Sequence, residues 1–127
     1  MYDNVLINTY MLKASVQNKA KRFLFSSSAC VYPNYKLTVS NVPGLKEEDA
    51  YPADPSEAYG WEKLFTERMV QSFQKDYKLN VRITRYHSTY GPEGIYKGGK
   101  EKAPAALCRK VAEASNPGTI DIWGDGK

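Results

Sequence analysis

The first half of the chain alternates between helix-like and strand-like patterns of apolar positions. Residues 3–18 repeat apolar side chains with a helical period, so we expect a helix with one buried face. The apolar run 22–25 is typical of a buried parallel strand, and it leads directly into three consecutive serines. Residues 31–55 are rich in proline and polar side chains and are expected to form a long loop. Loops of that length in compact domains are usually functional or disordered.

The pattern after this loop predicts a second helix and a second strand. Residues 54–78 favour a helix, because Asp54 can cap its start and Pro55 suits the first helical position. Residues 81–86 alternate between apolar and polar side chains, which indicates a strand, and a Tyr-Gly-Pro turn follows them.

The last part of the chain predicts one more helix and one more strand. Residues 104–114 are expected to be helical, and residues 119–123 to form a short strand. The resulting order of elements is that of an α/β protein with a parallel sheet. Active groups in such sheets gather at the carboxyl ends of the strands. Ser28 ends one predicted strand and Ser88 closely follows another, so we expect both to face one crevice with Tyr59.

Composition places the chain among ordinary globular proteins. It has 127 residues, of which 42% are hydrophobic and 25% charged, which fits one domain with a single core. No apolar run is long enough to cross a bilayer, and no signal peptide is evident, so a cytoplasmic location is expected, with no membrane partner. Cys30 and Cys108 lack the spacing of a metal site, so we expect no metal and two free thiols.

The net charge of +4 comes largely from one basic segment. Its members are Lys97, Lys100, Lys102, Arg109 and Lys110. The segment is short and is interrupted by small apolar residues, so a small phosphorylated ligand is favoured over nucleic acid. A solvated basic surface is the alternative that any charge cluster leaves open.

Tyr59 and Lys63 offer chemistry because residues four apart share one face of a helix. An ammonium beside a phenol favours the ionised phenol, which then accepts a proton near neutral pH. The hydroxyl of Ser28 can hydrogen-bond the same oxygen. Such a set suits removal of a proton from an alcohol while hydride leaves to a nicotinamide. The alternative is a core tyrosine with a lysine whose ammonium reaches solvent.

Three strings in order carry a resemblance to a known family. They are Ser26–Pro33 with its serine run, Tyr59–Lys63, and Arg85–Pro92 with its closing turn. Together they resemble the extended short-chain dehydrogenase/reductases, which include the epimerases and dehydratases of nucleotide sugars. The resemblance implies a partial Rossmann-like parallel sheet with flanking helices. It covers the middle portion of the family pattern, without the N-terminal dinucleotide-binding strands and most of the C-terminal substrate lobe.

Further strings are similar to the branch of that family that acts on GDP-mannose. Cys30 stands where most of the family has threonine or serine, and the segments 97–110 and 122–126 also match. Ser88 is a departure, because the pattern has an asparagine there that contacts substrate. The resemblance implies NAD as cofactor, GDP-mannose as substrate and a homodimer.

The resemblance also assigns roles to single residues. Tyr59 takes the proton of the C4 hydroxyl, Lys63 supports the tyrosine and holds the nicotinamide ribose, and Ser28 hydrogen-bonds the C4 oxygen. The resulting ketone acidifies the protons at C3 and C5. Cys30 and Lys102 are then the base and acid that invert those carbons.

Substrate contacts are implied for Ser28, Ser88, Glu101, Lys102 and Lys110. Taken alone, Cys30 would be read as a small buried hydrophobe.

No glycine-rich dinucleotide motif accompanies these residues, and this leaves two hypotheses of different class. The first is an NAD-dependent epimerase of GDP-mannose, with another epimerase, a dehydratase or a decarboxylase of the same superfamily as its nearest rival. The second is a catalytically inactive remnant or a nucleotide-sugar binding module.

Overall fold

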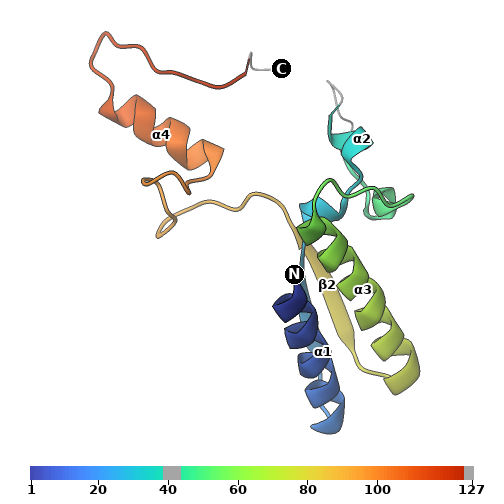
Figure 1. Ribbon diagram of the computed structural model, residues 1–127. Helices are drawn as coiled ribbons and strands as arrows, with labels where there is room; N and C mark the ends of the chain where they lie inside the picture. The colour runs from blue at the N-terminus through green and yellow to red at the C-terminus, as the bar shows by residue number, and fades with distance from the viewer. Residues whose placement is uncertain (39–43, 125–127) are drawn as a thin grey trace. The chain divides into compact units, whose positions relative to one another are not determined.

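The computed structural model describes residues 1–38 and 44–124, which belong to two compact units, Met1–His87 and Ser88–Lys127. The first holds α1 (Tyr2–Gln17), β1 (Phe23–Ser28), η1 (Ala29–Val31), α2 (Asn34–Leu37), η2 (Glu47–Ala50), α3 (Ala58–Tyr77) and β2 (Val81–Tyr86). The second holds α4 (Ala103–Glu113). Figure 1 shows α1 and α3 beside the β2 strand.

The two strands confirm the predicted parallel sheet. β1 and β2 pair in parallel, with Phe23 opposite Val81 and Ser28 opposite Tyr86. Helix α3 connects them, which is the crossover that parallel strands require. The last residues of the two strands, Ser28 and Tyr86, pair with each other, so both strands end at the same edge of the sheet. The serine run therefore ends directly beside the end of β2.

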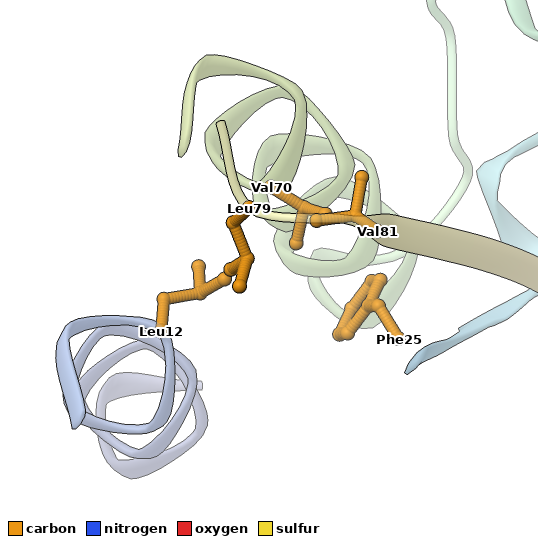
Figure 2. Packing of buried hydrophobic residues seen from close by; sticks show 5 residues of the cluster. All are labelled: Leu12, Phe25, Val70, Leu79 and Val81. Atoms are coloured by element: carbon orange, nitrogen blue, oxygen red, sulfur yellow. The ribbon is translucent and has the colours of Figure 1, made fainter. Parts of the chain in front are cut away.

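The core of the first unit lies between the two long helices and the sheet. Leu12 of α1, Phe25 of β1 and Val70 of α3 are buried together with Leu79 and Val81. Figure 2 shows Leu12 reaching from its helix toward Leu79 and Val70. These contacts fix α3 over the sheet, which determines where the first turn of α3 lies relative to the end of β1.

A second buried cluster attaches the segment after β1 to the same helix. Val31, Tyr32 and Ala50 pack on Leu64 of α3. The predicted long loop is therefore more ordered than expected, because it contains α2 and η2, and an ion pair between Lys36 and Asp49 joins them. Residues 39–43 lie outside the described residues.

One expected boundary and one expected strand are wrong. Helix α3 begins at Ala58, with Glu57 in an extended conformation as its N-cap, because the carbonyl of Asp54 accepts a hydrogen bond from the backbone N–H of Asn34. Residues 119–123 form no strand in the described part of the chain. There, the Asp121 carbonyl accepts from Lys110.

The expected match of 122–126 falls partly on residues 125 and 126, which lie outside the described residues. Among the helices that the structure describes, none is long and apolar enough to cross a membrane.

Candidate active site

The carboxyl end of β1 presents Ser28 and Cys30 close together. Ser28 is the last residue of the strand, and its backbone is extended, with φ −143° and ψ 152°. Its Oγ accepts a hydrogen bond of 3.2 Å from the backbone N–H of Cys30, so Ser28 caps the short η1 helix. Ser28 is partly buried, whereas the Cys30 thiol is exposed and free. The exposed thiol does not fit the alternative interpretation of Cys30 as a small buried hydrophobe.

Tyr59 and Lys63 lie on the first two turns of α3, above the same strand end. The Lys63 ammonium lies 5.5 Å from the centroid of the Tyr59 ring and 5.0 Å from that of Phe25. It also donates a hydrogen bond of 2.9 Å to the backbone carbonyl of Ser26. Tyr59 is 44% exposed. One lysine therefore joins the helix, the tyrosine and the serine run.

The helix distinguishes this pair from two others with the same sequence spacing. Tyr32 precedes α2, which holds Lys36, and Tyr96 and Lys100 lie outside any helix. Only a shared helix stacks residues four apart on one face. The spacing alone is therefore not selective, but the spacing within α3 is.

Gly60 brings the start of α3 against the backbone of Cys30. A Cβ added at Gly60 would lie 2.2 Å from the Cys30 carbonyl oxygen and 2.8 Å from the Cβ of Pro55. Real Cβ atoms do not approach backbone so closely, so this position accepts only glycine without movement. The sequence reasoning missed Gly60, although its place directly after Tyr59 was the available signal.

An ion pair between α3 and β2 lies beneath this site, and it was also missed. Arg85 binds both oxygens of Glu67, with Nε to Oε1 at 2.9 Å and Nη2 to Oε2 at 2.7 Å. Glu67 is 2% exposed. The hydrogen bonds to Glu67 raise the pKa of the Arg85 guanidinium above its ordinary value. The only signal of this ion pair in the sequence was that Arg85 is a charged residue in an alternating strand.

The second unit holds the other predicted residues, with Glu101 and Lys102 at the start of α4 and Lys110 in its last turn. Lys102 is the exposed N-cap of the helix, and Ser88 is exposed at the start of the unit. Glu101 is largely buried and accepts from Arg109 at 3.4 Å. Its own backbone N–H, then that of Gly99 and then Arg109, lower the pKa of its carboxyl. One carboxylate oxygen of Glu101 has no hydrogen-bond partner among the described residues.

Part of the basic segment is neutralised within the second unit. Lys97 and Arg109 pair with the two carboxylate oxygens of Glu113, at 3.2 and 2.9 Å. Lys110 donates to the Asp121 carbonyl at 2.5 Å. A cavity of about 590 Å³ is lined by Glu101, Arg109 and Lys110 and by apolar side chains that include Leu107 and Trp123. Charged and apolar walls of this kind suit a polar organic ligand.

Four of the predicted residues are thus gathered in the first unit, and four lie in the second. Those of the first are Ser28, Cys30, Tyr59 and Lys63; those of the second are Ser88, Glu101, Lys102 and Lys110. The first group combines a phenol, an ammonium, a hydroxyl and a thiol, which are groups able to accept, donate and stabilise protons. The pairing of Cys30 with Lys102 spans the two units and stays a prediction.

The whole chain matches one known family. The model of the NAD dependent epimerase/dehydratase family matches residues 1–127. The chain is 48% identical over 126 residues to GDP-mannose 3,5-epimerase 1 of Oryza sativa subsp. indica, covering 99% of this chain and 32% of that protein. It is 47% identical over 126 residues to GDP-mannose 3,5-epimerase of Arabidopsis thaliana, covering 99% and 33%. The chain spans about a third of the length of these curated relatives.

Solved structures with the same fold include two enzymes of sugar nucleotides. UDP-N-acetylglucosamine 4-epimerase from Methanobrevibacter ruminantium superposes with a TM-score of 0.76 at 26% identity, over 97% of this chain and 36% of that one. GDP-mannoheptose C4 reductase from Campylobacter jejuni, solved with NADP bound, has a TM-score of 0.72 at 26% identity, over 87% and 32%.

Proposed function

The chain belongs to the NAD dependent epimerase/dehydratase family, and on that premise we propose that its protein inverts C3 and C5 of GDP-mannose through a transient ketone at C4. The observation that carries this proposal is the gathering of Ser28, Cys30, Tyr59 and Lys63 at one strand end. It occurs in a chain that is nearly half identical to GDP-mannose 3,5-epimerases.

The donor set in the first unit fits a nicotinamide cofactor. The Lys63 ammonium has three N–H donors and uses one on the Ser26 carbonyl, so two remain for ribose hydroxyls. Tyr59 is 44% exposed, which leaves part of its side chain accessible to a ligand. Lys63 and Tyr59 would hold the cofactor. NAD, when bound, supplies the chemistry of accepting a hydride from C4 and returning it.

The first step falls to the residues around the end of β1. Tyr59 accepts the proton of the C4 hydroxyl, and the nearby Lys63 ammonium stabilises the negative charge on the phenolic oxygen. Ser28 donates a hydrogen bond to the C4 oxygen. Its Oγ already accepts from the Cys30 backbone, so its own hydrogen is left to point at a ligand. These three groups stabilise the alkoxide as it becomes a ketone.

Inversion then needs proton exchange on both faces of the sugar ring. The C4 ketone acidifies the C3 and C5 protons, Cys30 removes a proton from one face, and Lys102 returns one from the other. The exposed thiol of Cys30 is accessible for this task. Glu101 and Lys110, which line the cavity of the second unit, bind the sugar and the diphosphate, and Ser88 takes the place of the expected asparagine.

Solvent deuterium tests this function directly. The full-length gene product that contains this chain is incubated with NAD and GDP-mannose in heavy water, and deuterium at C3 and C5 is followed by NMR. We expect incorporation at both carbons. If the gene product shows none, residues 1–127 are inserted into the Arabidopsis thaliana enzyme in place of its matching third. A chimera without exchange contradicts the enzyme function and leaves an inactive or binding protein.

Cys30→Ala separates inversion from oxidation. We expect the variant to lose deuterium exchange by at least about 100-fold, as is usual for removal of a proton-transfer group. Isotope transfer from C4-deuterated substrate to NAD should persist, because Tyr59, Lys63 and Ser28 remain. Cys108→Ala is the matched control, since Cys108 is also an exposed free thiol. Equal loss of both reactions in Cys30→Ala would contradict the role given to the thiol.

We also propose a homodimer and a cytoplasmic location. Apolar side chains on α1 and α3 support the dimer, because Ile7, Met11, Trp61 and Phe65 are each roughly half exposed. Two free thiols support a reducing compartment.

A further inference from the structure

We propose that the buried ion pair of Glu67 and Arg85 positions the segment 28–31, which carries Ser28 and Cys30, by holding it at both ends. Neither charged residue belongs to the set assigned above. This inference rests on the proposed function, because it concerns the same two groups.

Glu67 holds the beginning of the segment. Ser27, the residue before Ser28, is 3% exposed, and its hydroxyl donates a hydrogen bond of 2.5 Å to Oε1 of Glu67. The side chain of Ser27 points to the opposite face of the strand from Ser28, as successive residues of a strand do. Anchoring Ser27 to helix α3 therefore fixes the direction in which Ser28 leaves the strand.

Arg85 holds the end of the segment. Tyr32 is 4% exposed and follows η1 directly, and its ring lies 5.2 Å from the guanidinium carbon of Arg85. The Arg85 Nη1 also donates to the Tyr32 hydroxyl at 3.4 Å and to the backbone carbonyl of Glu47 at 2.5 Å. One guanidinium thus joins strand β2, helix α3, η2 and the end of the segment.

The two anchors act as one unit because the charges are paired in a largely buried place. The Arg85 side chain is 15% exposed and that of Glu67 3%. A bidentate pair is geometrically rigid, and loss of one partner leaves the other charged group buried without compensation. A change at Glu67 is therefore expected to move Arg85, and with Arg85 the contact to Tyr32.

Glu67→Gln in the full-length gene product tests the proposal. The amide keeps the shape, and its oxygen in the place of Oε1 can still accept from Ser27 and from Arg85 Nε, but its NH₂ group then faces the Nη2 donor of Arg85 and breaks the bidentate pair. We expect kcat for deuterium exchange to fall about 100-fold, since misplacement of a reacting group by about 1 Å costs that much. The KM for GDP-mannose should change little. Amide hydrogens of residues 28–32 should exchange faster in the variant, as measured by mass spectrometry.

Glu62→Gln is the matched control. Glu62 is 1% exposed on the same helix, but its carboxylate accepts from Asn8 and Thr66 rather than from the segment. We expect this variant to leave the amide exchange of residues 28–32, kcat and KM unchanged. Equal effects of the two variants would show a general loss of packing and would overturn the proposal.

Tyr32→Phe provides a milder test if Glu67→Gln does not fold. It removes one hydroxyl and keeps the ring over Arg85, and we expect a fall in kcat of about tenfold. Tyr35→Phe, at an exposed position of α2, is its control. Unchanged kcat and unchanged amide exchange in Tyr32→Phe would contradict the anchor at this end. The amide measurement needs no activity, so it tests the anchor even if the wild-type protein is not an epimerase.

Discussion

At the scale of single residues, Gly60 determines how closely Tyr59 and Cys30 approach each other. Its missing side chain lets the first turn of α3 lie directly on the Cys30 carbonyl. Tyr59 is the neighbour of Gly60 in sequence, so the same contact relates Tyr59 to Cys30. With any other residue at position 60, the start of α3 would need to move away from the end of β1.

Gly60→Ala is therefore expected to destabilise the protein and to lower activity. In an ordinary helix this change stabilises by roughly 0.5–1 kcal/mol. Here the new Cβ would lie 2.2 Å from a backbone oxygen, so the helix start or the Cys30 segment must move. We expect a lower midpoint of thermal unfolding and a fall in deuterium exchange at C3 and C5.

Gly44→Ala serves as the control, because a Cβ there meets nothing within 4 Å. A Gly60→Ala protein as stable and active as the Gly44→Ala protein would contradict the close approach.

At the scale of elements, local patterns predicted α1, α3 and α4 and both strands to within a few residues. Their apolar periods and the proline before α4 are local signals. The start of α3 was wrong because Asp54 is held by Asn34, a contact between distant residues that no local pattern contains. Residues 119–123 have β-forming side chains, but a strand also needs a partner, and the described residues supply none there.

The residues of the candidate site likewise divide into those that local patterns predict and those that they do not. Tyr59, Lys63, Ser28 and Cys30 were predictable because short strings carry them. Glu67, Arg85 and Gly60 were not, because their importance lies in contacts between α3, β1 and β2.

Helix α4 allows a prediction about pH. Arg109, and then Lys97, lower the pKa of the Glu113 carboxyl below its ordinary value of 4.5. Because the pKa is lower in the folded protein than in the unfolded one, the pairing stabilises fully above pH 4.5 and is lost as pH falls through the lowered value. We expect the NMR titration midpoint of Glu113 to rise toward 4.5 in Arg109→Gln.

Arg22→Gln removes an exposed arginine from the other unit and should leave that midpoint unchanged. An equal midpoint in wild type and Arg109→Gln would show that the pair does not form in solution.

At the scale of the whole molecule, the proposed homodimer follows from what α1 and α3 leave uncovered. Their inner sides hold Leu12 and Val70 in the core, whereas Ile7 of α1 and Phe65 of α3 are 57% and 56% exposed. Large apolar groups on two packed helices are typical of an interface. A two-fold dimer would use each residue twice, so a single change acts on both copies.

Phe65→Glu in the full-length gene product is therefore expected to shift the protein from dimer to monomer in sedimentation velocity. Burying a phenylalanine contributes about 1.5–3 kcal/mol, so the dissociation constant should rise at least tenfold. Leu37→Glu, at an exposed position of α2, should leave the dimer intact. A monomeric wild type, or a Phe65→Glu protein that stays dimeric, would contradict the interface. Because α3 also carries Tyr59 and Lys63, we expect the monomer to bind NAD more weakly than the dimer does.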